Sequence, residues 1–266
     1  MTRLHSRFLH PKRIEVLGMA TLSQTVPARP IETFARRMGV VDRYFYFTMS
    51  LLFAVIVIWG FSRTVDENLL HPAIPRPLIL WFHAAVFSLW IVFFIFQSVL
   101  VRTRNVKWHR FFGRFGAGLG AALVPLGTAT AIVMGRFDRY QLHQPGAESF
   151  LIIPFFAMAA FGTPFILAIA WRKKPELHRR LLFIATCSLL DAPLDRFDFL
   201  FDHNLSFLCL DLVIGLGVVR DLLVNRRIHR VYLIALPTLI VLQGLVTLIW
   251  RSEASWWVRI AHSIIA

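Results

Sequence analysis

The sequence predicts an all-α protein, a polytopic transmembrane helix bundle of about seven spans. Of the 266 residues, 57% are hydrophobic and only 17% are charged, and the mean hydropathy is +0.62. Soluble domains of this length do not normally reach such a composition. The apolar residues also gather in runs of roughly 17 to 25, the length needed to cross a bilayer core of about 30 Å. These observations exclude a disordered chain, a coiled coil and a secreted disulfide scaffold.

Seven apolar segments define a transmembrane domain over residues 44–250, and the fifth of them is the shortest. The predicted spans are 44–61, 78–101, 111–135, 150–171, 180–194, 204–220 and 231–250. Residues 1–43 are basic and interrupted by prolines, which predicts a disordered cytoplasmic tail. Residues 251–266 are expected to form a short periplasmic tail.

The distribution of Lys and Arg predicts the orientation of the chain. With the N-terminus inside, eight basic residues precede the first span, and five, five and four fall in the cytoplasmic connections, so that 22 of the 29 lie inside. The positive-inside rule therefore predicts an N-in, C-out protein of the bacterial inner membrane. The net charge of +14 then indicates topology and contact with anionic lipids, and argues against nucleic acid as a partner.

The chain carries no motif of a soluble enzyme, since it has no P-loop, no GxGxxG, no HExxH and no GxSxG. Its two cysteines, Cys187 and Cys209, fall inside predicted spans, which is typical of packing residues rather than of a disulfide or a zinc site. Polar groups within spans are costly in lipid and are expected to face the bundle interior. They are therefore the candidate sites.

The second span carries His83 and Gln97 on one helix face, about 21 Å apart. Phe87, Trp90 and Phe94 lie between them on the same stripe. This pattern fits a helix that faces a cofactor, and it also fits a histidine that is hydrogen-bonded to a neighbouring span. In either case we expect His83 to face other helices, with polar neighbours from the third, fifth or sixth span.

The third span opens with His109 and continues with a line of glycines on one side of the helix. These glycines are Gly113, Gly116, Gly120 and Gly127. A stripe of this kind lets another helix approach closely, as in GxxxG packing. It would also let a flat macrocycle lie against the backbone, so both interpretations stay open.

A His-Arg motif opens two predicted spans at the cytoplasmic side, as His109-Arg110 and as His178-Arg179-Arg180. Two imidazoles at one level could be the axial ligands of a heme b, and Arg110 and Arg179 could bind its propionates. If so, the glycine side of the third span should face the fifth span. The alternative is that these residues only anchor helix ends at the membrane surface.

The segment DAPLDRFDFLFDHN holds four aspartates with helical spacing and a histidine. They are Asp191, Asp195, Asp198, Asp202 and His203. If the segment were one helix, Asp191 and Asp195 with His203 could bind a divalent metal ion. A solvated turn at the outer side explains the same residues without a metal.

Several segments resemble a group of uncharacterised bacterial multi-pass membrane proteins of about this size. They are Gly60-Phe61, FHAAVFSLWIVFFIFQSVLV, WHRFFGR, PELHRRLLFIAT and RRIHRVYL, and the likeness runs from about residue 42 onward. It implies the membrane fold and no activity. The helices that open with His-Arg also look distantly similar to two-heme transmembrane cytochromes and ferric-reductase-like membrane domains. Those proteins usually carry two histidines per ligating helix, whereas Gln97 and Leu123 occupy the second positions here.

Three classes of function follow. The leading specific hypothesis is a b-type heme protein that exchanges electrons with quinone or another redox partner through His109 and His178, or through His83. The second is a metal-dependent intramembrane enzyme that acts on a lipid-like substrate through Asp191, Asp195 and histidines near the outer leaflet. The third is a transporter, assembly factor or scaffold without a cofactor.

Overall fold

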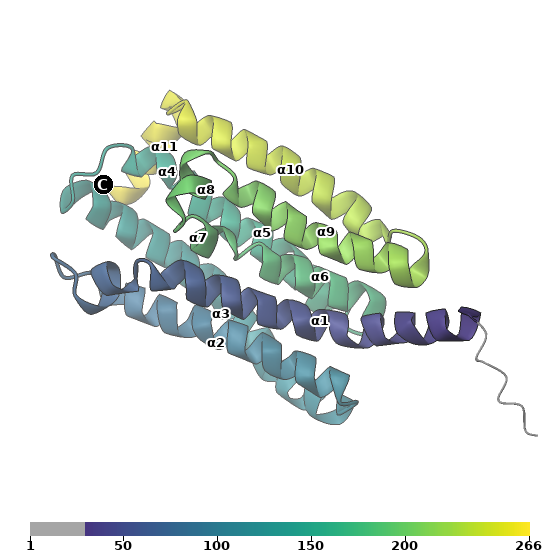
Figure 1. The fold of residues 1–266 in the computed structure, drawn as a ribbon. Coiled ribbons are helices and arrows are strands. Elements are labelled where there is room, and N and C mark those ends of the chain that lie inside the picture. Colours follow the sequence, from purple (N-terminus) through teal and green to yellow (C-terminus); the bar gives the residue numbers. More distant parts are fainter. Residues whose placement is uncertain (1–29) are drawn as a thin grey trace, which may run out of the picture.

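The computed structural model describes residues 30–266, with side chains from residue 39 onward, and this part of the chain consists of helices and turns without a strand. The long helices run side by side in one bundle (Figure 1). They are α1 (Pro30–Ser62), α2 (Ile79–Arg102), α3 (Val106–Tyr140), α5 (Ile152–Ala170), α9 (Ser206–Asn225) and α10 (Arg230–Arg251). The shorter elements are the π-helix η1 (Asp66–Leu70), α4 (Ala147–Phe150), α6 (Pro175–Cys187), α7 (Asp191–Leu194), α8 (Asp198–Asp202) and α11 (Ser255–Ile265).

Five helical segments are long and apolar enough, by length and composition, to cross a membrane. They are Gly39–Ser62, Ile79–Arg102, Val106–Tyr140, Ala147–Ala170 and Arg230–Arg251. These segments coincide with the first four predicted spans and the last one. The chain therefore has the helices of an integral membrane protein, as its composition predicts.

The fifth and sixth predicted spans are helical but do not meet the same criteria. The fifth is divided into α6, which has 13 residues and is thus about 20 Å long, and the single turn α7. The sixth corresponds to α9, which carries Asp211, Arg220 and Asp221. Figure 1 places α6 and α9 within the bundle beside the longer helices, and α6 contacts α5, α9 and α10. Neighbouring helices cover most of α6, which therefore needs less apolar surface than a span that faces lipid, whereas α9 leaves aliphatic side chains such as Leu212 exposed.

Aromatic and aliphatic side chains fill the centre of the bundle. Phe53 of α1, Phe161 of α5 and Phe183 of α6 are fully buried, and Phe53 stacks on Phe183 at 5.7 Å between ring centroids. Trp90 of α2 packs edge-on against Phe161 at 5.5 Å. These rings connect α1, α2, α5 and α6 into one core.

The glycine side of α3 faces α2 and α5, not α6. A Cβ atom at Gly116 would overlap Phe93 of α2, and one at Gly120 would overlap Phe165 of α5 and Trp90 of α2. At Gly127 it would overlap Met158 of α5. The glycines therefore do not turn toward the fifth span, which counts against a heme that lies along the stripe between His109 and His178. From Gly116 onward the stripe is filled by side chains, which is the close packing that a GxxxG pattern predicts.

The two terminal segments differ from the tails that the sequence predicts. Residues 1–29 of the predicted tail 1–43 lie outside the described residues, and the chain is helical from Pro30. At the other end, residues 251–266 include the helix α11, which packs on α3 and α4 through a small cluster around Trp257 and Ala261. The Arg136 guanidinium of α3 donates to the backbone carbonyls of Ile264 and Ala266. The C-terminal segment is thus part of the folded bundle.

We expect Gly120→Ala to destabilise the protein by about 1–3 kcal/mol, because the added methyl group would collide with two packed rings. Gly118→Ala is the matched control, since no heavy atom other than its own chain neighbours and local helix backbone lies within 4 Å of a Cβ at that position. Thermal unfolding of both variants in detergent measures the difference. Equal melting temperatures would contradict this account of the glycine stripe.

Candidate functional site

The structure brings together His109, at the start of α3, and His178, at the start of α6. Their ring centroids lie 6.4 Å apart, with an interplanar angle of 74°. His178 Nδ1 donates to the backbone carbonyl of Ala168 at 2.9 Å. Because a carbonyl oxygen only accepts, Nδ1 carries a proton, and the lone pair of the neutral His178 ring is on Nε2. The Nδ1 atom of His109 is buried and has no hydrogen-bond partner within the described part of the chain.

His178 is held in position by a backbone carbonyl at the C-terminal end of α5. The last carbonyls of a helix have no partner in the helix itself, and the chain turns after Trp171 before α6 begins with Pro175 at its first position. His178, one turn into α6, points back and satisfies the Ala168 carbonyl. A ring nitrogen held by a carbonyl in this way is the usual arrangement behind a metal-ligating histidine.

The surroundings of the histidine pair fit a bulky ligand only in part. Gly113, one turn after His109, faces open space, whereas Gly116, Gly120 and Gly127 of the same stripe are covered. Arg110 is exposed beside His109. Arg179, in contrast, is already engaged, since it donates to Glu176 at 2.7 Å and pairs with Asp42 at 3.4 Å. Of the two predicted propionate-binding arginines, the structure therefore favours Arg110.

His83 lies on α2 away from this pair. Its ring stacks on Phe87 of the same helix at 4.0 Å between centroids, and its buried Nδ1 has no hydrogen-bond partner among the residues that the structure describes. A hydrogen bond from Nδ1 to a polar group of another span is thus not seen within the described residues. Trp90 Nε1 and the Gln97 side chain, further along the same face, are likewise buried and without partners in that part of the chain.

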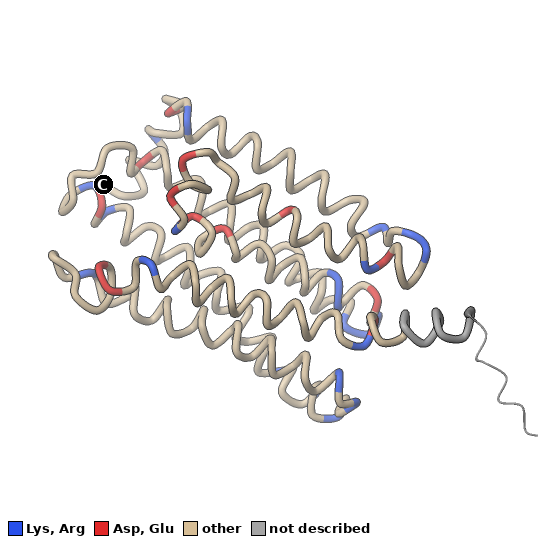
Figure 2. Tube along the Cα trace, in the orientation of Figure 1, with Lys and Arg blue, Asp and Glu red and all other residues tan. Residues whose placement is uncertain are grey.

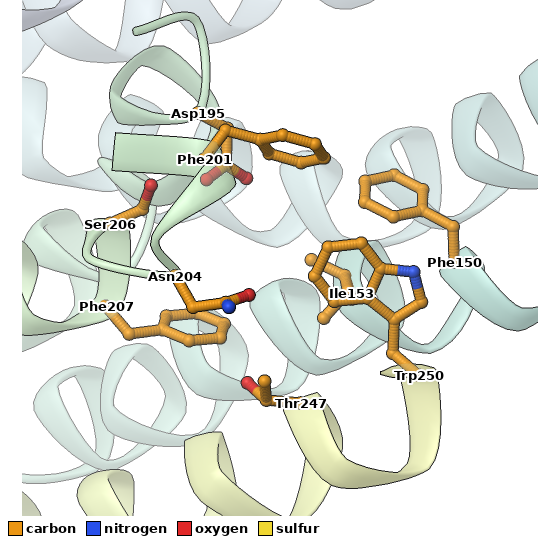
Figure 3. A pocket seen from close by; sticks show the side chains of 9 residues that line it. All are labelled: Phe150, Ile153, Asp195, Phe201, Asn204, Ser206, Phe207, Thr247 and Trp250. Atoms are coloured by element: carbon orange, nitrogen blue, oxygen red, sulfur yellow. The ribbon is translucent and has the colours of Figure 1, made fainter. Parts of the chain in front are cut away.

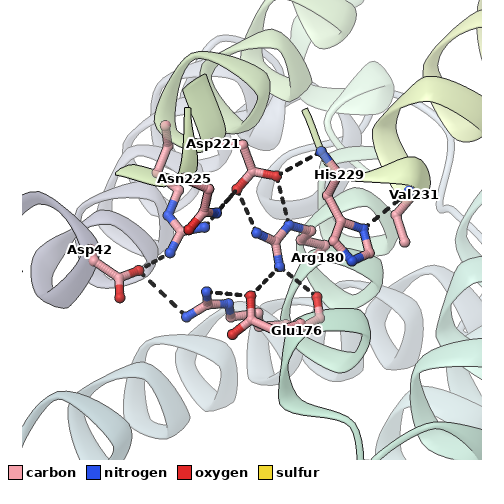
Figure 4. Close-up of polar contacts among 9 residues, drawn as sticks. Asp42, Glu176, Arg180, Asp221, Asn225, His229 and Val231 are labelled. Carbon is pink, nitrogen blue, oxygen red and sulfur yellow. Dashed lines mark hydrogen bonds and ion pairs between the residues drawn. The ribbon is translucent and has the colours of Figure 1, made fainter. Parts of the chain in front are cut away.

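A cluster of charges, with Arg180, Arg220 and Asp221 buried at its centre, lies where α1, α6 and α9 meet (Figure 4). Arg180 donates from Nε and Nη2 to the two carboxylate oxygens of Asp221, at 2.8 and 2.6 Å, and both side chains are at most 1% exposed. Its Nη1 donates to the Glu176 carboxylate and to the Glu176 backbone carbonyl, each at 2.7 Å. Arg220 pairs with Asp221 at 2.6 Å and also with Asp42 of α1. We call this set, with Arg179, the charge cluster.

The start of α10 is attached to the same charge cluster. The backbone N–H of His229 donates to Asp221 at 3.3 Å, and the His229 ring accepts from the Val231 N–H to cap the helix. Burial and the nearby positive charge of Arg180 lower the pKa of His229. Burial alone would raise the pKa of Asp221, but the hydrogen bonds from Arg180 and Arg220 lower it. Both shifts mean that the unfolded chain takes up protons first, so that acidification weakens the folded state.

Sequence reasoning did not find the charge cluster. Asp42, Arg220 and Asp221 stand at the ends of predicted spans, where charges are counted as topology signals. The sequence VVRD could have indicated the charge cluster. The positive-inside rule explains a basic residue at this helix end but not the acidic residue beside it, so the aspartate suggests an ion pair.

The predicted outer metal site is not assembled in the structure. Asp191 lies in α7, Asp195 at its C-terminal end, and Asp198 and Asp202 in α8, so the four aspartates do not share one helix. Asp191 is buried and accepts the Ala192 N–H, while His203 is exposed, with Nδ1 bonded to the Phe199 carbonyl. Within residues 39–266 no group of three His, Cys, Asp or Glu side chains is placed to hold a metal ion.

Comparisons of this chain with models of protein families, with curated proteins and with solved structures found no match. The argument for function therefore depends on the site itself.

We expect Arg180→Gln and Asp221→Asn each to destabilise the protein by about 3–5 kcal/mol, because each leaves a buried charge without its partner. The double variant should lose less than the sum of the two. Lys173→Gln, in the exposed turn just before α6, is the control and should leave the melting temperature unchanged. Strictly additive losses would show that the two side chains do not interact.

Proposed function

We propose that this chain is a multi-pass protein of the bacterial inner membrane that binds a b-type heme between His109 and His178. The observation that carries the proposal is the meeting of these two rings, 6.4 Å apart, from helices that are distant in the sequence. Two imidazoles on opposite sides of one metal ion, with metal–nitrogen bonds of about 2 Å, have ring centroids about 6 Å apart. The observed separation agrees with that value.

The protein groups around the pair have separate roles in this proposal. His178 is oriented by the Ala168 carbonyl, which keeps the lone pair on Nε2. His109 supplies the second nitrogen, and the open space at Gly113 allows a flat ring to approach α3 next to it. Arg110 would bind a propionate at the membrane surface.

A b-type heme would supply one-electron transfer, and quinone is the redox partner that is soluble in the same bilayer. The cytoplasmic level of both histidines in the proposed topology places this chemistry at the inner surface. With one histidine on each helix, the arrangement would differ from that of the two-heme cytochromes that the motifs resemble.

The proposed topology has seven crossings, N-in and C-out. In Figure 2 the turn between α2 and α3, the start of α6 and the turn between α9 and α10 lie at one end of the bundle, and Lys and Arg cluster there. These are the connections that sequence analysis assigns to the cytoplasm. The combined path of α6 and α7, together with α9, supplies the two crossings that are not apolar enough by composition.

The heme proposal predicts a Soret band and a reduced-form alpha band in the purified protein, both lost in His109→Ala and in His178→Ala. Arg110→Gln should weaken heme retention without abolishing it, because a propionate contact is one of several. His143→Ala changes an exposed histidine elsewhere and should keep the wild-type spectrum. Visible spectra of oxidised and dithionite-reduced protein, with heme content per chain, provide the measurement.

Two results would overturn the heme proposal. One is a wild-type protein, expressed with adequate heme supply, that has no Soret band. The other is an unchanged spectrum in both histidine variants. If the purified protein held neither heme nor a metal ion, the transporter, assembly-factor or scaffold class would be the remaining hypothesis.

The topology predicts that a periplasmic reporter fused at Ala266 is active, and that the same reporter fused after Arg230 is inactive. The physical reason is the excess of Lys and Arg on the cytoplasmic side, 22 of 29. A cytoplasmic reporter at the two positions gives the reciprocal control. Cytoplasmic activity at Ala266 would exclude the proposed N-in topology with seven crossings.

A further inference from the structure

The first turns of α3 carry three basic side chains on one side of the helix. They are Lys107, Arg110 and Arg114, and all three are exposed. Successive residues of a helix are about 100° apart, so these positions fall within about 60° of one another on the helix surface. They extend over about 10 Å along the helix axis. We call them the basic row.

The basic row has no acidic partner within the described part of the chain. The sequence holds no Asp or Glu from residue 68 to residue 137, and none of the three side chains forms an ion pair with a described residue. In Figure 2 the turn between α2 and α3 accordingly shows Lys and Arg without Asp or Glu beside them. The other two connections at this end contain acids that pair with arginines, Glu176 and Asp221. Positive charge therefore remains at the basic row for an anion from outside the chain.

A strip of exposed aromatic side chains adjoins the basic row on the same helix. Trp108, Phe111 and Phe115 are 52%, 59% and 55% exposed. Counted from Lys107, they point about 40–100° around the helix, on one side of the row. All of them belong to the candidate span Val106–Tyr140. Aromatic rings at the end of a span lie at the level of lipid headgroups, so an anion that reaches both surfaces lies in the membrane.

We propose that the basic row binds a phospholipid with two phosphates, of the cardiolipin type, whose acyl chains lie against the exposed rings of α3. The ammonium and guanidinium groups would donate to the phosphate oxygens. Two phosphates joined by one glycerol suit three cations spread over about 10 Å, because a headgroup with a single phosphate would leave one end of the row uncompensated. Basic clusters at the cytoplasmic ends of membrane helices are sites where such headgroups bind.

Other anionic partners fit the basic row less well. A nucleic acid or an acidic protein could reach Lys107 from the cytoplasm, but Arg114 lies seven residues further into the candidate span. A second copy of the chain would bring one basic row against another. The inference does not depend on heme. Lys107 and Arg114 test it without changing Arg110, the arginine that the heme proposal uses.

The opposite end of the bundle does not compete for such a lipid. The hollow where α4 joins α5, α9 begins and α10 ends (Figure 3) has room for only about one water molecule. On its wall Asp195 and Ser206 hydrogen-bond to each other. This hollow is therefore too small for a headgroup, and its carboxylate would repel a phosphate.

The test is lipid retention by the full chain. The protein is reconstituted in phosphatidylcholine nanodiscs that contain cardiolipin and phosphatidylglycerol at equal phosphate, extracted in mild detergent, and analysed by native mass spectrometry. Wild type should retain cardiolipin over phosphatidylglycerol. The double variant Lys107→Gln/Arg114→Gln should lower the ratio of cardiolipin-bound to lipid-free protein about twentyfold, because each removed charge weakens the contact about fivefold. Arg114→Gln alone should lower it about fivefold, which provides the test if the double variant does not fold.

Two controls separate the basic row from net charge and from the side chains themselves. Lys173→Gln/Lys174→Gln removes the same charge from the exposed turn before α6, at the same end of the bundle, and should retain cardiolipin as wild type does. Lys107→Arg/Arg114→Lys keeps both charges of the row and should also retain it. Thermal unfolding verifies that each variant is folded.

Three results would overturn the proposal. Wild type that retains the two lipids in proportion to their phosphate would have no selective site. Equal loss in the two double variants that remove charge would assign retention to net charge. A lipid-free dimer of wild type that Lys107→Gln/Arg114→Gln converts to monomer would show that a second copy of the chain covers the basic row.

Discussion

The buried pair of Arg180 and Asp221 is the interaction on which the arrangement of the helices depends. Two charges taken out of water are stable only if they are paired in good geometry and their remaining hydrogen-bonding groups are satisfied. Here each guanidinium nitrogen of Arg180 has a partner, from α9 on one side and from its own helix on the other. Any displacement of α6 against α9 would leave a charge unpaired. The pair therefore fixes the register between these two helices.

The charge cluster also determines where His178 lies. Successive residues of a helix point about 100° apart, so His178, Arg179 and Arg180 point in three directions from one turn of α6. Arg180 is directed to α9, and Arg179 is directed to Asp42 of α1. With these two directions fixed, His178 has to face the end of α5 and the ring of His109. The position of the candidate ligand thus follows from ion pairs that do not touch it.

Sequence patterns identified the helices well and their contacts less well. Apolar runs mark the ends of the long helices to within about five residues, except for α1, which begins at Pro30, well before the predicted start at residue 44. The fifth span is the hardest to recognise in the sequence. Helix α6 ends at Cys187 and is covered by neighbouring helices, so it can be shorter and less uniformly apolar than a helix that faces lipid. The glycine stripe of α3 showed which face is packed closely, but not which helix occupies it. The four aspartates do not line one helix face as their spacing predicts, because α7 ends at Leu194.

Buried polar atoms without a partner in the described chain occur on several helices, including atoms of Arg179 and Arg220 in the charge cluster. The charge cluster contains three basic and three acidic side chains and so neutralises itself. His83, Trp90 and Gln97 instead follow α2 at intervals of seven residues with buried polar atoms that have no partner in the described chain, as does His109 on α3. Such groups cost free energy in a membrane unless a ligand or water satisfies them. Along α2 these groups share one helix face, so in the heme proposal this face and His109 are where a ligand or water would relieve the cost.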